Sequence, residues 1–189
     1  MTLAQPMNTN ELRMVVIDIL RQRGVFEIAA RASADWLKHL EEKYPKGPRG
    51  GRHPLIRYAE KTAARIQASG QEAAFENMVL LFTYHAERWL QMTDPDVTEH
   101  RPYLQYHCAC LPDSRPSHTE KHRLILPIAH PFWSTWYPIN GLGCLCTVTT
   151  VSEFELTREK SKVSDVSHFN HLLPDEGFVF NIGKLLVRR

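Results

Sequence analysis

The sequence predicts an α+β protein, with a helical N-terminal half followed by a small mixed α/β module whose short sheet is stapled by a Cys/His metal site. Three observations lead to this prediction. Apolar residues recur at helical spacing through residues 1–94. Short runs rich in β-branched and aromatic residues replace that pattern over residues 100–183. All 4 cysteines lie in this second part, in two Cys-x-Cys pairs.

The first apolar residues are spaced as in an amphipathic helix from Leu12 to Leu40, and Gly24 is the only candidate break. We therefore expect one long, bent helix. The following stretch, PKGPRGGRHP, has three glycines and three prolines, which favours a loop.

Two further helices are expected before the character of the sequence changes. One runs from Leu55 and ends at Gly70. The next carries a core stripe, within which His85 is expected to be a partly buried histidine with a hydrogen-bond partner. The stripe consists of Phe75, Met78, Val79, Phe82, Ala86 and Trp89.

The second part follows an acidic link, TDPDVTEH, and contains three short β-type runs. These are YLQYHCAC, CTVTTVS and GFVFNIG. We predict a domain boundary between the helical region, residues 1–94, and the module, residues 100–183.

Four residues of this module are spaced as the ligands of a metal ion. Asp113 or Ser114 is expected to cap a short helix that starts near Pro116. His118 and His122, four residues apart, would then share one helix face. Cys144 and Cys146 follow a glycine pair that lets the backbone turn both thiolates inward.

The resulting hypothesis is a closed Cys2His2 zinc site formed by His118, His122, Cys144 and Cys146. Two alternatives stay open. In the first, the two histidines are only exposed helix residues, and the two cysteines are small buried apolar side chains. In the second, Cys108 and Cys110 contribute ligands to the site. An intracellular chain seldom keeps such pairs as disulfides, which favours a metal.

A catalytic metal is the less favoured interpretation. The sequence HTEKH contains the residues of the H-E-x-x-H motif in a different order. On a helix, Glu120 points away from the direction shared by the two histidines, so it cannot act as the base. A metal with four protein ligands also has no position for water.

The segment 43–65 is strongly basic, with seven Lys or Arg residues against one Glu, a net charge of +6. Such a segment can bind double-stranded DNA through its phosphates, without sequence preference. A solvated linker face is the alternative. The residues expected to contact DNA are Arg49, Arg52, Arg57, Lys61 and Arg65.

An aromatic cluster lies between two prolines, Pro131 and Pro138. We expect it to be buried against the sheet, with a contact to a partner protein as the alternative. The cluster consists of Phe132, Trp133, Trp136 and Tyr137.

The composition of the whole chain excludes few kinds of partner. A net charge of +2 neither requires nor excludes a polyanionic partner. No stretch reaches the ~18 continuous apolar residues of a membrane span, and no secretion signal is apparent, so we expect no membrane partner.

Several pieces of the second part, in this order, are similar to the phage Mu F-like head morphogenesis family. They are RPYLQY, DSRPSH with a second histidine four residues on, PFWSTWYP with INGLGC, the Cys-x-Cys pair, and PDEGFVFNIG. The chain departs from the family at Leu145, where arginine is usual, at Arg123, where glycine is common, and at Ala129 and His130, where an acidic pair is usual.

This resemblance implies a minor capsid protein, not an enzyme, which accompanies the portal protein during procapsid assembly and touches packaged DNA. Its partners would be the portal and the capsid or scaffold proteins. Its location would be the interior of the virion head and, during assembly, the bacterial cytoplasm. The alternatives are a metal-dependent hydrolase or nuclease, and a DNA-binding protein.

Overall fold

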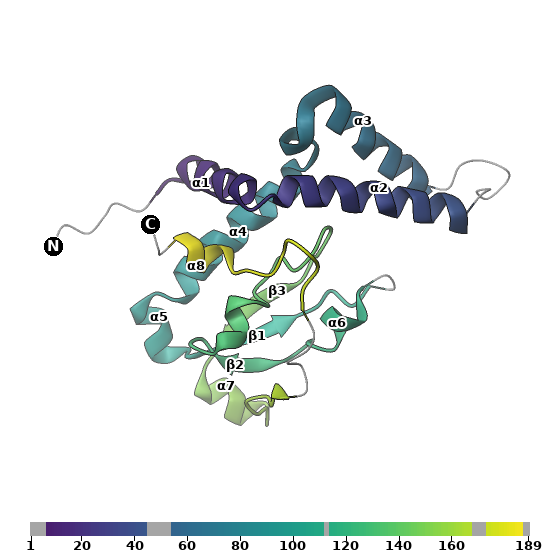
Figure 1. The fold of residues 1–189 in the computed structure, drawn as a ribbon. Coiled ribbons are helices and arrows are strands. Elements are labelled where there is room, and N and C mark those ends of the chain that lie inside the picture. Colours follow the sequence, from purple (N-terminus) through teal and green to yellow (C-terminus); the bar gives the residue numbers. More distant parts are fainter. Residues whose placement is uncertain (1–6, 45–53, 112–113, 168–172, 187–189) are drawn as a thin grey trace. The chain divides into compact units, whose positions relative to one another are not determined.

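The computed structural model describes residues 7–44, 54–111, 114–167 and 173–186. Contacts within the chain divide it into two compact units, Met1–Leu80 and Leu81–Arg189 (Figure 1). We call them the N-terminal unit and the C-terminal unit and describe each by itself. The predicted boundary lies further along the chain, between residues 94 and 100, and stays a prediction.

The N-terminal unit contains α1 (Thr9–Gln22), α2 (Val25–Lys43), α3 (Pro54–Ala74) and the start of α4 (Glu76–Met92). The single bent helix predicted across Gly24 is wrong. Gly24 has a left-handed backbone, with φ of 64°, which ends α1 and precedes α2.

The helices of this unit bury apolar residues and are linked at the surface by ion pairs and an exposed aromatic contact. On α1, Arg21 contacts Glu72 at 2.7 Å, while Trp36 of α2 meets Tyr58 of α3 edge to face at 6.5 Å. The end predicted for the third helix at Gly70 is confirmed as an interruption, since Gly70 has non-helical backbone angles inside α3.

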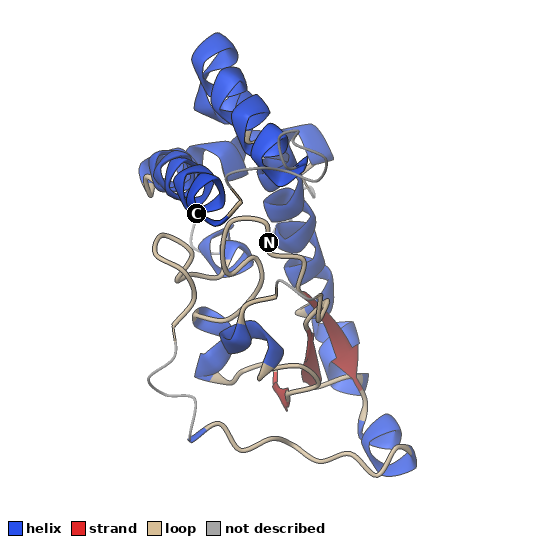
Figure 2. Cartoon of the chain, turned by 90° about the vertical axis from the view of Figure 1, so that its right-hand side faces the viewer, coloured by secondary structure: helices blue, strands red, loops and turns tan. Residues whose placement is uncertain are grey.

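The mixed α/β architecture predicted for the second part of the chain is confirmed, and the C-terminal unit contains a small sheet of three strands (Figure 2). The strands are antiparallel and lie in the order β2-β1-β3. Its elements after α4 are α5 (Pro95–His100), β1 (Tyr103–His107), α6 (Pro116–Thr119), β2 (Ile125–Pro127), the 3-10 helix η2 (Pro131–Ser134), β3 (Thr147–Val151), α7 (Glu153–Arg158) and α8 (Ile182–Leu186).

The strand predicted at GFVFNIG is wrong. Residues 177–181 lie outside any strand and lead into α8. Phe178 and Phe180 are both buried and stack on Phe82 of α4, at 6.1 and 5.5 Å between ring centroids. The apolar residues that suggested a strand are therefore buried by packing on a helix, not by pairing in a sheet.

The core stripe of the fourth helix is confirmed, since its six residues are all buried. His85 is buried as well, and its ring packs edge to face on Tyr84 and Tyr137. Burial lowers the pKa of His85 to about 4, so its ring is neutral at pH 7. Its backbone carbonyl accepts a hydrogen bond from the Tyr137 hydroxyl at 2.9 Å.

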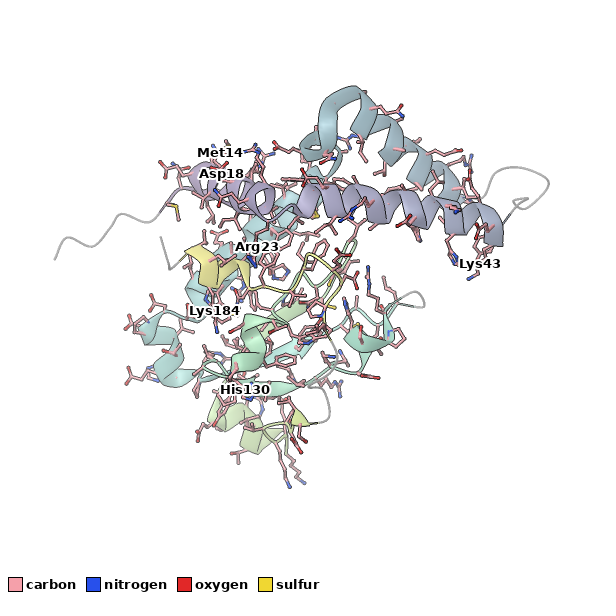
Figure 3. All side chains as sticks on the ribbon, viewed as in Figure 1. Met14, Asp18, Arg23, Lys43, His130 and Lys184 are labelled. Atoms are coloured by element: carbon pink, nitrogen blue, oxygen red, sulfur yellow. The ribbon has the colours of Figure 1, made fainter. Side chains whose placement is uncertain are left out.

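Three members of the aromatic cluster, Trp133, Trp136 and Tyr137, are buried in the C-terminal unit, and Phe132 is half-buried. Trp133 donates through Nε1 to the carbonyl of Pro127 at 3.0 Å. At the start of η2, His130 accepts a hydrogen bond from the Phe132 amide (His130 is labelled in Figure 3). Contact of this cluster with a partner stays a prediction.

The packing of α8 on α4 depends on the absence of a side chain at Gly183. A Cβ atom at this position would overlap the side chain of Trp89. We expect Gly183→Ala to lower the free energy of unfolding by about 2 kcal/mol or more, because overpacking forces neighbouring groups to shift. Urea denaturation would measure this.

The matched control is Lys184→Ala, one residue further along α8 (Lys184 is labelled in Figure 3), which removes a hydrogen bond to the exposed Ser134 hydroxyl. It also removes the cation–π contact of Lys184 Nζ with the Trp89 ring, 5.6 Å from the ring centre, so it should change the free energy of unfolding by no more than about 1 kcal/mol. A Gly183→Ala protein as stable as the wild type would show that α8 is not packed this closely on α4.

Candidate metal centre

A histidine and two cysteines meet inside the C-terminal unit. The Nδ1 atom of His118 lies 3.7 Å from Cys144 Sγ and 3.6 Å from Cys146 Sγ. All three ligand atoms lie within 4.8 Å of one another, and each residue is 3% exposed. Among the described residues no other group of His, Cys, Asp or Glu was found with this spacing.

The histidine is placed by α6, a single turn that begins with Pro116. Proline in the first turn was predicted and is confirmed, but the predicted cap at Ser114 is wrong. Ser114 instead accepts a hydrogen bond from the amide of Leu111, and Arg115 is the N-cap residue. Asp113, the other predicted cap, lies outside the described residues.

Arg115 joins α6 to the segment that carries the cysteines. Its guanidinium donates to the carbonyl of Leu142 at 2.9 Å and contacts the carboxylate of Asp175 at 2.7 Å. Gly141 lies directly beneath this ion pair, because a Cβ there would overlap the Asp175 carboxylate. The lack of a side chain at Gly141 is thus what lets the three segments approach.

Cys144 and Cys146 follow a turn in which the Cys144 amide donates to the carbonyl of Gly141 at 3.1 Å. Gly143 has a left-handed backbone, with φ of 73°, in this turn. The role predicted for the glycines, to let both sulfur atoms face one point, agrees with this geometry.

His122, the fourth predicted ligand, is not brought into the group. The helix ends at Thr119, and the next residues form a tighter turn in which the His122 amide donates to the carbonyl of Thr119. A tighter turn rotates successive side chains further than an α-helix, so His122 no longer shares a face with His118. Its ring is exposed, and its Nδ1 accepts from the amide of Cys108 at 3.3 Å.

The other two cysteines lie just after β1. Cys108 is buried and Cys110 is exposed. The amide of Cys110 donates to Cys108 Sγ at 3.3 Å. Burial opposes ionisation of Cys108, but hydrogen bonds from Cys110 and from the hydroxyls of Ser114 and Thr119 leave its pKa lowered.

The electrostatics of the group favour one thiolate. Hydrogen bonding from Cys146, assisted by His118, lowers the pKa of Cys144 to about 4 against the effect of burial. Sharing that proton with Cys144, together with burial, raises the pKa of Cys146. A metal ion would displace this proton, since both sulfurs bind metal as thiolates.

The group fits a tetrahedral zinc ion. With Zn–N and Zn–S bonds of about 2.1 and 2.3 Å, nitrogen and sulfur ligands lie about 3.6 Å apart, close to the two separations observed. Imidazole and thiolate are also the ligands that zinc prefers. The far ring nitrogen of His118, Nε2, is buried without a hydrogen-bond partner in the described part of the chain, as is Asn140 Oδ1.

Sequence reasoning missed Lys121, which is fully buried beside this group. Its Nζ lies 3.8 Å from the centre of the Trp136 ring and donates to the carbonyl of Ser117 at 2.8 Å. Trp136 in turn meets the His118 ring edge to face at 5.7 Å. A lysine in a polar stretch gives no sequence signal for burial.

The predicted DNA-binding residues belong to the N-terminal unit. Arg57, Lys61 and Arg65 are exposed and lie four residues apart on α3, so they share one face of that helix. Arg49 and Arg52 lie outside the described residues.

The fold and the site define a helical protein with a small α/β module built around a buried His/Cys group. No protein-family model matches the chain, and no solved structure matches it either. Two curated proteins are similar to it. The first is named "Mu-like prophage FluMu F protein", from Haemophilus influenzae, and is 33% identical over 81 residues, which are 43% of this chain and 19% of that protein.

The second, from Escherichia phage Mu, is named "Putative capsid assembly protein F" and is 31% identical over 100 residues, 52% of this chain and 22% of the relative. The resemblance to the Mu F proteins is therefore confirmed. The matched stretch covers about a fifth of each relative's length.

Proposed function

We propose that this protein is a minor head component of a tailed phage or prophage and that it assists procapsid assembly together with the portal protein. The observation that supports this most directly is the similarity to a protein named for capsid assembly. Capsid or scaffold proteins are the other proposed partners. The proposed location is the interior of the virion head, reached from the bacterial cytoplasm during assembly. The proposed role is structural, without enzymatic activity.

We further propose that a zinc ion holds the C-terminal unit together. His118 on α6 and the two thiolates before β3 would be three of its ligands. The metal would join α6 to the sheet, and much of its binding free energy would be folding free energy. Support comes from the ligand types, from their separations of 3.6 and 3.7 Å, and from their burial.

Burial also argues against a catalytic metal in a hydrolase or nuclease. A catalytic zinc keeps one position for water or substrate, whereas each of the three residues here is 3% exposed. Glu120, the acid of the HTEKH segment, is exposed just after α6. A structural zinc explains this arrangement better.

Contact with double-stranded DNA is a second proposed role, and it belongs to the face of α3 that carries Arg57, Lys61 and Arg65. Three exposed cations on one helix face can neutralise phosphates without reading base sequence.

In the part of the chain that the structure describes, none of the helices has the length and apolar character needed to cross a bilayer.

Purified protein should contain about one zinc per chain, and chelation should unfold the C-terminal unit. Cys146→Ser should lower the free energy of unfolding by more than about 3 kcal/mol, because it removes one zinc ligand and with it folding free energy. Elemental analysis and thermal denaturation with and without chelator would measure both. Cys110→Ser, at an exposed cysteine, is the matched control and should retain the metal. Metal-free protein with an unchanged melting temperature would remove the zinc site.

Co-expression with the portal, scaffold and major capsid proteins of the same phage should place the protein in isolated procapsids. Cys146→Ser should lower its amount per particle at least about tenfold, because an unfolded C-terminal unit cannot dock. Quantitative mass spectrometry of purified procapsids would measure this. An assembly role would be contradicted if the wild-type protein were as abundant in the particle-free fraction as in the procapsid fraction.

Replacing Arg57, Lys61 and Arg65 together with glutamine should weaken binding to random-sequence duplex DNA and flatten its salt dependence by up to about three counterions. Fluorescence anisotropy across a salt series would measure both quantities. The control variant replaces Lys160 and Lys162, two exposed lysines of the other unit. No binding by the wild type at low salt would end the DNA proposal.

A further inference from the structure

We infer that Cys108 is the fourth ligand of the metal centre, so that the site has three thiolates and one imidazole. This inference rests on the proposed zinc site, because it names the residue that completes that site. It replaces His122, which sequence spacing predicted.

Strand register places Cys108 opposite Cys146. The pairing of β1 with β3 ends at His107, opposite Thr147. Continued by one residue, the same register places Cys108 directly opposite Cys146. Residues that face each other across an antiparallel pair have Cβ atoms about 4.5 to 5.5 Å apart. A single metal ion can bridge two thiolates at that separation.

Cys108 also lies on the buried face of the sheet. Along β1, Leu104 and Tyr106 are buried and their neighbours are more exposed. Cys108 continues this alternation and is 6% exposed. On β3, Val148 is buried opposite Tyr106, and Cys146 is buried two residues before it. Cys108 and Cys146 therefore project from the same buried face.

The sulfur atom of Cys108 lies close to α6. Cys108 Sγ lies 4.0 Å from the hydroxyl of Thr119, the residue that follows His118 on α6. The atom thus borders the element that carries the histidine ligand. It lies outside the group whose ligand atoms are all within 4.8 Å of one another. A change of one staggered χ1 position moves Sγ by about 3 Å, which is the scale of movement that metal binding would require.

The competing residues are placed less well. His122 is exposed, and its Nδ1 already accepts the amide of Cys108 at 3.3 Å. That hydrogen bond makes His122 a positioning residue for the Cys108 backbone. Cys110 is exposed, lies beyond the end of β1, and has a left-handed backbone, with φ of 50°, which an extended strand does not adopt.

Cobalt(II) substitution of the full chain separates these assignments, because sulfur-to-cobalt charge-transfer absorption scales with the number of bound thiolates. Cys108→Ser should remove about one third of that absorption per bound ion and weaken zinc binding at least about 100-fold, more than the loss of a supporting residue does. His122→Ala should keep the full absorption and weaken binding by about 10- to 100-fold, as the loss of a supporting residue does and less than Cys108→Ser. Cys110→Ser, the matched cysteine control, should change neither.

X-ray absorption of the zinc-loaded wild type needs no variant and covers the case in which Cys108→Ser fails to fold. Three sulfur neighbours and one nitrogen support the inference. Two sulfurs and two nitrogens, or full cobalt absorption in folded Cys108→Ser, overturn it while the zinc proposal stands. A wild-type chain that binds neither zinc nor cobalt overturns both.

Discussion

The C-terminal unit depends on bringing three buried side chains, an imidazole and two thiols, to one point from two separate segments. An imidazole and two thiol groups buried together cost free energy unless they are paired, and the shared proton between Cys144 and Cys146 pairs them only in part. The neighbouring residues keep the histidine and the two cysteines in these positions. Arg115 fixes α6 to the cysteine segment, and Gly141 leaves room for its ion pair with Asp175. A zinc ion, as proposed, would convert a costly burial into folding free energy.

The rest of the unit is held together mainly by buried aromatic side chains and less by the sheet. Three short strands supply few ladder hydrogen bonds and little apolar area. Asn181, just before α8, donates to the carbonyl of Trp133 at 2.8 Å, and the Tyr137 hydroxyl reaches α4. These long-range hydrogen bonds join the two ends of the unit to its middle. A small unit of this kind gains most from a metal staple, because its own core is limited.

The fold class and the helical stripe of α4 could be predicted because periodicity reports burial directly. The prediction of a strand at residues 177–183 failed because the sequence does not show which element its apolar residues pack against. Phe178 and Phe180 alternate as in a strand, yet they stack on Phe82 of a helix. Three of the four predicted ligands lie together. His122 does not join them because α6 ends after one turn, which no sequence signal indicated. The burial of Lys121 depends on the tertiary position of Trp136, which no local pattern contains.

The two proposed roles lie in different units of the chain. The proposed metal ligands belong to residues 81–189, whereas the cationic face of α3 belongs to residues 1–80. Substitutions at independent sites usually have additive effects. Loss of a zinc ligand should therefore affect stability and assembly, while loss of the α3 cations should affect DNA binding and its salt dependence. If both kinds of substitution altered both properties, the two sites would not be energetically independent.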